Sequence, residues 1–171
     1  MRQRAVLSLL VLLSVFFGLT EARAGAGTAE CKKLVGTYLT ENRPKGESAE
    51  IFTSRSLLSL GAAHLAIFAD SGEGGEAGFA PFTEGQGNWY CQPAESGLKV
   101  RATTFDFTVP AADSKGGIGR LDFDLAYDPA GETLKGTATL YLIPLEGDPL
   151  AADALKDGRS FAVAGKRVKA P

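Results

Sequence analysis

The sequence predicts an all-β fold: an antiparallel up-and-down barrel of about eight strands with one short helix near the C-terminus. Three consecutive segments between Leu98 and Ile143 alternate apolar and polar residues with a period of two, which is typical of strands with one apolar face. Glycine, proline and aspartate separate these segments, and no long connection suited to a crossover is present. Such strands can also form a two-sheet sandwich, but the hairpin-like spacing favours the barrel.

Strand patterns extend over most of the chain. The predicted strands are, in order, residues 34–40, 51–60, 64–70, the segment around Trp89, and residues 98–109, 120–127, 134–143 and 160–168. Residues 41–48 and 71–78 are expected to be loops, because they are rich in glycine and polar residues.

One short helix is predicted before the last strand. Asp148 suits the N-cap, Pro149 the first helical position, and Gly158 the position just past the end. Leu150 and Leu155 are expected to pack from this helix onto the barrel.

The strands of the central segment define the predicted interior. In residues 120–127 one side is entirely apolar and consists of Leu121, Phe123, Leu125 and Tyr127. In the preceding strand Phe105 and Phe107 share one side, and Asp106 takes the opposite, solvated side. If residues 128–131 form the turn to the next strand, Phe123 lies opposite Gly136. In the same register Leu125 lies opposite Leu134, and a slip of one residue would invert every side chain.

Three polar residues are candidate anchors for a ligand inside the barrel. Arg101 shares a side with Phe105 near one opening, where a guanidinium binds a carboxylate well, although it can also pair with an acidic side chain as a structural plug. His64 is the only histidine, so it can serve as a general base or an anchor but not in a multi-histidine metal site. Tyr38 is the third candidate.

The acidic residues of the central strands give a weaker alternative site. Asp122 and Asp124 lie two residues apart on one side of a strand, and Asp106 is expected near Asp122. Carboxylates held close together can act as an acid and base pair. Arg120 and Lys135 share the same side, however, so a solvated outer wall is the favoured interpretation.

The first 24 residues have the features of a secretory signal peptide. Two arginines precede an apolar run from Ala5 to Leu19, and a small-x-small sequence follows at residues 22–24. The run is shorter than the roughly 20 residues of a spanning helix. We therefore expect a secreted or periplasmic protein without a membrane span in the mature chain, formed by one domain of residues 25–171.

The net charge and the cysteine content of the sequence restrict the kinds of molecule that the protein can be expected to bind. The leader holds three arginines and one glutamate, so without it the formal net charge falls from −2 to −4, and no basic stripe suits nucleic acid. Cys31 and Cys91 are expected to form a disulfide in an oxidising compartment. The closed loop lowers the entropy of the denatured chain, which stabilises the folded protein by about 4 kcal/mol. They lack C-x-x-C spacing and nearby histidines, so neither a metal nor a cofactor is predicted.

Two short motifs resemble those of lipocalin-like, calycin-type small barrels. They are Gly36-Thr37-Tyr38 in the first strand and Gly87-Asn88-Trp89, together with the meander and the helix before the last strand. Tyr38 stands where lipocalins have tryptophan, the Gly-x-Trp falls in mid-chain, and no Thr-Asp-Tyr follows. The resemblance implies a hydrophobic ligand in the cavity. A more distant likeness to allene-oxide-cyclase and dirigent barrels implies cyclisation or coupling without a metal.

The leading functional hypothesis is a barrel that binds a small, mainly apolar molecule, with orientation set by a few polar groups. The predicted ligand-binding residues are Arg101, His64, Tyr38, Phe105, Phe107, Phe123 and Tyr127. One alternative is a cofactor-independent isomerase or cyclase that uses His64 or the acidic residues. Another is a protein-interaction module that uses the loops of residues 41–48 and 71–78. The oligomeric state is not indicated.

Overall fold

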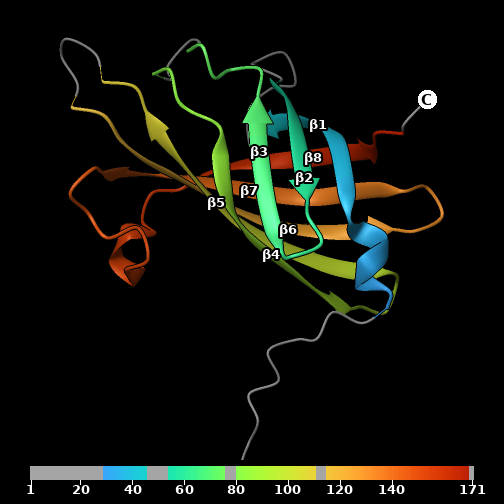
Figure 1. The fold of residues 1–171 in the computed structure, drawn as a ribbon. Helices are drawn as coiled ribbons and strands as arrows, with labels where there is room; N and C mark the ends of the chain where they lie inside the picture. The colour runs from blue at the N-terminus through green and yellow to red at the C-terminus, as the bar shows by residue number, and fades with distance from the viewer. Residues whose placement is uncertain (1–28, 46–53, 76–79, 111–114, 170–171) are drawn as a thin grey trace, which may run out of the picture.

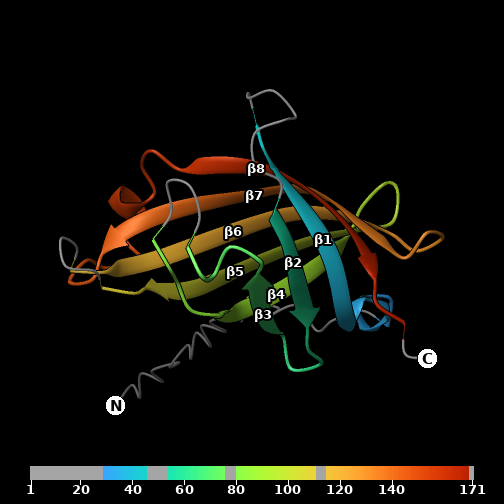
Figure 2. The ribbon, with the colours of Figure 1, turned by 90° about the horizontal axis from the view of Figure 1, so that it is seen from above.

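The structure is a computed structural model that describes residues 29–45, 54–75, 80–110 and 115–169. Eight antiparallel strands form a closed barrel, in which each strand pairs with its sequence neighbours and β8 pairs with β1 (Figures 1 and 2). The strands are β1 (Gly36–Pro44), β2 (Ser54–Leu60), β3 (Leu65–Asp70), β4 (Gly85–Pro93), β5 (Leu98–Thr108), β6 (Gly117–Asp128), β7 (Thr133–Pro144) and β8 (Arg159–Arg167). The predicted up-and-down barrel is confirmed.

The connections between strands alternate between the two ends of the barrel. Strands β1, β3, β5 and β7 finish at one end of the barrel, which we call the open end, and β2, β4 and β6 finish at the other, the closed end. The 3-10 turn η1 (Cys31–Leu34) precedes β1 at the closed end. A second 3-10 turn, η2 (Ala152–Ala154), lies in the last open-end connection, on the opposite side of the molecule in Figure 1.

The helix predicted before the last strand is reduced to η2. The Asp148 carboxylate accepts a hydrogen bond from the Leu150 N–H at 2.8 Å, which forms a tight turn rather than a helix cap. Leu150 is 72% exposed, so the expected packing of this residue onto the barrel is wrong. Leu155 is half-buried.

The first strand is longer than predicted. β1 continues through residues 41–44, which were expected in a loop, because β8 pairs with it as far as Pro44 opposite Phe161. Proline is tolerated there because it ends the strand. Residues 51–53 of the predicted second strand lie outside the described residues.

A hydrophobic core fills the barrel toward the closed end. The rings of Phe68 and Phe123 meet inside it with centroids 5.4 Å apart. The predicted inward side of residues 120–127 is confirmed. The core consists of Leu34, Tyr38, Leu58, Leu60, Ala66, Phe68, Trp89, Leu98, Val100, Ala102, Leu121, Phe123, Leu125, Tyr127, Leu134, Ala138 and Val163.

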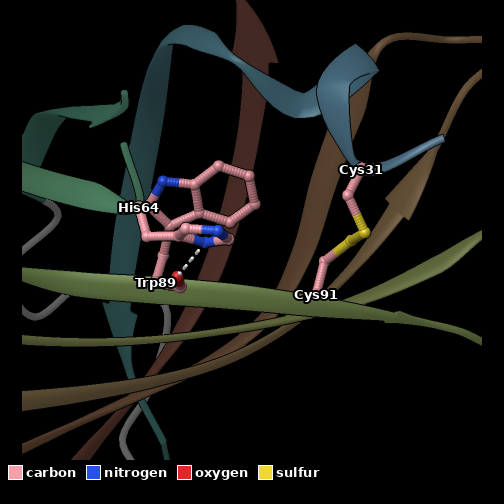
Figure 3. Close-up of a disulfide and its surroundings, with 4 residues drawn as sticks. All are labelled: Cys31, His64, Trp89 and Cys91. Carbon is pink, nitrogen blue, oxygen red and sulfur yellow. Dashed lines mark hydrogen bonds between the residues drawn. A yellow bond between two sulfur atoms is a disulfide. The ribbon is translucent and has the colours of Figure 1, made fainter. Parts of the chain in front are cut away.

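The closed end is covered by η1 and fastened by a disulfide. Figure 3 shows Cys31 of η1 bonded to Cys91 of β4, as predicted from the sequence. Beside it, the Trp89 side chain projects from the same strand and donates its indole N–H to the Gly61 carbonyl at 2.9 Å. These contacts join the start of the domain to its middle.

An arginine of the last strand also closes this end. The Arg167 guanidinium carbon lies 5.0 Å from the centroid of the Tyr38 ring, and one of its nitrogens donates to the Tyr38 hydroxyl at 2.7 Å. Another donates to the Val35 carbonyl at 2.7 Å. The Tyr38 hydroxyl in turn donates to Leu34 of η1 at 3.0 Å, and burial raises the pKa of Tyr38.

The register between β6 and β7 differs by two residues from the prediction. Phe123 lies opposite Ala138, and Leu125 opposite Gly136. The last pair is Asp128 with Thr133, so the four residues that connect the strands are 129–132 instead of the expected 128–131. Because the shift is even, every side chain keeps its predicted side.

β5 is the strand whose orientation the sequence predicted wrongly. Phe107 is 53% exposed, Arg101 is exposed and Phe105 is half-buried, so these residues lie on the outer wall. The ladder to β6 runs without a bulge, and the apolar residues change sides within the strand. The inward side consists of Leu98, Val100, Ala102, Thr104 and Asp106.

The predicted signal peptide, residues 1–24, lies outside the described residues. Within the part of the chain that the structure describes, no helix has the length and apolar character needed to cross a membrane.

Removing the disulfide should destabilise the closed end. Replacing both Cys31 and Cys91 by alanine is expected to lower the free energy of unfolding by about 3–4 kcal/mol, because the denatured chain regains the freedom of a loop with a sequence separation of 60. Urea denaturation measures the change. Dithiothreitol should reproduce it in the wild type and have no effect on the variant. Equal stability of the two proteins would show that η1 is held by packing alone.

Candidate functional site

A cavity of about 400 Å³ lies inside the barrel at the open end. Every strand except β4 contributes to its lining. Phe68, Leu121 and Ala138 belong both to this lining and to the hydrophobic core, so the core forms the floor of the cavity. The space therefore lies above a packed half-barrel and opens away from the disulfide.

One wall of the cavity is apolar. It is formed by β6, β7 and β8, with residues such as Leu121, Leu140 and Phe161 facing the space. Leu142 lies further toward the mouth and is 58% exposed. This wall offers an apolar molecule the same kind of surface as the core beneath it.

The opposite wall is polar and is formed by β1, β2, β3 and β5. Its main feature is a network around Asp70 at the end of β3. One Asp70 carboxylate oxygen accepts hydrogen bonds from the Ser54 hydroxyl at 2.8 Å and from the Asn42 amide at 3.1 Å. The other oxygen accepts the Gly72 N–H at 2.7 Å. These donors satisfy the Asp70 carboxylate inside the barrel.

Asp106 is the second carboxyl of the polar wall, and it is only 3% exposed. It lies opposite Gly119 of β6, whose N–H donates to the carboxyl. A β-carbon at Gly119 would collide with the Asp106 carboxylate oxygen, so glycine provides the space that this side chain occupies. Burial and the charge of Glu73 raise the pKa of Asp106 to about 7. A carboxyl of this kind can gain or lose a proton near neutral pH.

Three of the predicted ligand-binding residues lie in the core near the closed end. Tyr38 and Tyr127 pack edge to face there, with ring centroids 6.2 Å apart. Phe123 packs on Phe68 at the floor. The structure thus brings these three aromatic side chains into one core, and none of them lines the cavity.

The other four predicted residues lie elsewhere on the barrel. His64 is exposed in the turn between β2 and β3 at the closed end, where its Nδ1 lies 3.0 Å from the Trp89 carbonyl oxygen (Figure 3). Arg101 is exposed on the outer wall and does not line the cavity. There it donates a hydrogen bond to the Tyr90 hydroxyl at 3.2 Å. Phe105 and Phe107 share that outer wall. The binding role of all seven residues stays a prediction.

The carboxylate pair of β6 lies outside the barrel. Asp122 pairs with Arg120 at 3.0 Å, and Asp124 pairs with Lys99 at 3.2 Å, as on a solvated wall. Asp106, which was expected near Asp122, lies inside instead, because β5 faces the opposite way. The described residues contain no group of three or more histidine, cysteine or acidic side chains that could hold a metal ion.

Sequence reasoning missed Asp70 and Asn42 as site residues, and it placed Asp106 on the outer wall instead of inside the barrel. A signal for Asp106 was present in the first half of its strand, where Leu98 and Val100 alternate with charged residues. An unbroken strand that buries those two must also bury Asp106. Asp70 and Asn42 carry no comparable signal, because only strand pairing brings them together.

The fold and the cavity together define a closed eight-stranded antiparallel barrel with an internal site at one end. No protein-family model, no curated protein and no solved structure matches this chain.

Asp106 should make stability depend on pH. Its folded pKa of about 7 lies above its ordinary value of 3.8, so the folded protein binds the proton more tightly. The contribution of Asp106 to the free energy of unfolding is therefore fully present below about pH 4. It is lost as the pH rises toward 8, a decrease on the order of 2–4 kcal/mol. The Asp106→Asn variant should lack this part of the pH profile.

Urea denaturation between pH 4 and pH 8 measures the difference between the two proteins. Asp124→Asn is the matched control, because Asp124 is exposed on the outer wall. Parallel pH profiles for the wild type and Asp106→Asn would contradict the raised pKa.

Proposed function

We propose that the protein is an extracytoplasmic barrel that binds a small, mainly apolar molecule in the open-end cavity. The cavity of about 400 Å³ carries this proposal. Its volume falls in the range of roughly 300–1,000 Å³ that small-molecule sites occupy. Transfer of a ligand from water onto the apolar wall contributes about 25 cal/mol per Å² of apolar surface removed from water.

The division of the barrel into two halves supports the same function. The closed half holds the packed core, the disulfide and the contact of Arg167 with Tyr38. These interactions stabilise the fold without any contribution from a ligand. The open half can then keep an internal space that a core residue does not fill.

The resemblance to calycin-type barrels supports a binding function as well. Gly36, Thr37 and Tyr38 begin β1, and the closed eight-stranded architecture agrees with that class. The predicted signal peptide and the disulfide support a secreted or periplasmic location. The enzyme and interaction-module alternatives stay predictions.

Filling the cavity should abolish binding of an apolar probe. Ala138 lines the cavity on β7 and is 3% exposed, so Ala138→Phe introduces a ring where the ligand would lie. We expect N-phenyl-1-naphthylamine, which fluoresces in apolar surroundings, to bind the wild type and to bind this variant at least about tenfold more weakly. Fluorescence titration gives the two dissociation constants.

Ala164→Phe is the matched control for this experiment. Ala164 lies exposed on the outer side of β8, so the same substitution there leaves the cavity unchanged. Its affinity for the probe should equal that of the wild type. A folded Ala138→Phe protein that bound the probe as tightly as the wild type would place the binding site elsewhere.

A further inference from the structure

The charged side chains of the cavity all have one sign. Asp70 and Asp106 are the charged residues among the described ones that line the space, and no lysine or arginine accompanies them. None of the ion pairs formed by the described residues involves either carboxyl. The described residues therefore supply no cationic side chain that would pair with a carboxylate in this cavity.

A buried acceptor without a partner lies on the same wall. Asn42 is 6% exposed, and its amide nitrogen donates to Ser54 Oγ at 3.0 Å and to Asp70 Oδ2. This second contact fixes the orientation of the amide, because an amide oxygen in that position would face a carboxylate oxygen. Asn42 Oδ1 is left without a hydrogen-bond partner. An acceptor buried in this way calls for a donor that the described residues do not supply.

A second buried oxygen without a hydrogen-bond partner lies on the same side of β5 as Asp106. Thr104 precedes Asp106 on the inward side of β5 and is fully buried, and its Oγ1 has no hydrogen-bond partner. Asp70, by contrast, has several donors within its network. Asp106 is therefore the carboxyl of the polar wall that is better placed to accept hydrogen bonds from a ligand.

The two ends of the barrel also differ in charge. The described residues of the open-end connections, residues 45, 71–75, 80–84, 109–110, 115–116 and 145–158, include six acidic and three basic side chains. The closed-end segments, residues 29–35, 61–64, 94–97, 129–132 and 168–169, carry three of each. A negative field at the entrance attracts cations and repels anions.

We propose that the ligand of this cavity is an apolar molecule that carries a protonated amine. The amine lies against the polar wall, where Asp106 supplies the opposite charge and Asn42 Oδ1 supplies an acceptor. The apolar part lies against β6, β7 and β8. This inference rests on the proposed function, because it specifies the chemistry of a ligand in the same cavity.

The chemistry of other ligand classes fits less well. An alcohol offers one O–H donor but no charge, so it leaves the buried carboxyl without a counterion. A carboxylate brings a further negative charge beside Asp106 and Asp70 and supplies no donor. An ammonium group supplies up to three N–H donors together with the positive charge.

The ionisation of Asp106 gives the inference a pH signature. Asp70 and Glu73 add negative charge from β3 and the connection after it, Gly119 donates its N–H from β6, and exposed Lys115 precedes that strand. Because the pKa of Asp106 is about 7, a bound cation favours the ionised carboxyl. Affinity for an amine should therefore rise between pH 6 and pH 8, whereas affinity for an alcohol should not.

Three probes with the same alkyl chain test the inference on the wild-type protein. Decylamine, 1-decanol and decanoate differ only in the head group, and each is titrated against bound N-phenyl-1-naphthylamine. At pH 7.5 we expect decylamine to displace the dye at concentrations at least about tenfold lower than 1-decanol, with decanoate the weakest. The ratio of amine to alcohol affinity should increase between pH 6 and pH 8.

Substitution of Asp106 tests which group recognises the amine. Asp106→Asn keeps the shape of the side chain and removes the charge, so it should reduce the preference for decylamine over 1-decanol about tenfold. Asp124→Asn on the outer wall is the matched control and should retain the preference. Circular dichroism checks that both variants are folded. If Asp106→Asn does not fold, the wild-type pH profile still decides the question.

The outcomes separate this inference from the function on which it rests. If 1-decanol binds but decylamine shows no advantage, or if decanoate binds best, the inference is wrong and the apolar-ligand function stands. If Asp106→Asn folds and keeps the full preference, the inference is also wrong. If neither the dye nor any of the three alkyl probes binds, the proposed function itself fails.

Discussion

The unbroken ladder between β5 and β6 decides the chemistry of the barrel interior. It contains eleven residue pairs without a bulge, so the two sides of β5 stay distinct along its whole length. Near the closed end this constraint buries Val100 and Ala102, which suit a core. Further along it buries Thr104 and Asp106 and leaves Phe107 in solvent. The polar wall is therefore a consequence of strand continuity.

The two halves of the barrel interior have opposite effects on the stability of the fold: the closed half stabilises it, and the open half destabilises it. Burial of a carboxyl and of acceptors without partners costs free energy, as the raised pKa of Asp106 reflects. The aromatic and aliphatic core of the closed half, with the disulfide beside it, offsets this cost. Departures from the rule that apolar side chains face inward are expected at functional sites, and here they gather around one cavity.

The sequence was sufficient for the architecture, because turn residues and period-two patterns mark each strand without reference to its partners. It also identified the disulfide and the inward side of β6, where one side is uniformly apolar. It failed for β5, because the apolar residues change sides within the strand and only pairing with β6 decides between them. The sequence predicted a cavity but could not identify the polar residues that line it, for a related reason. Asn42 and Asp70 are 28 residues apart in the chain and meet only through folding.

Pairing of β8 with β1 has a consequence for how the chain acquires its fold. The first strand receives one of its two neighbours only when residues 159–167 have been synthesised, since these form the last strand. Until then two strand edges lie unprotected, and contacts between the chain's distant ends make slow folding the expectation. Arg167 belongs to β8, reaches across to η1 and completes the closed end only when β8 is in place. The finished ring leaves no edge on which a second chain can continue the sheet.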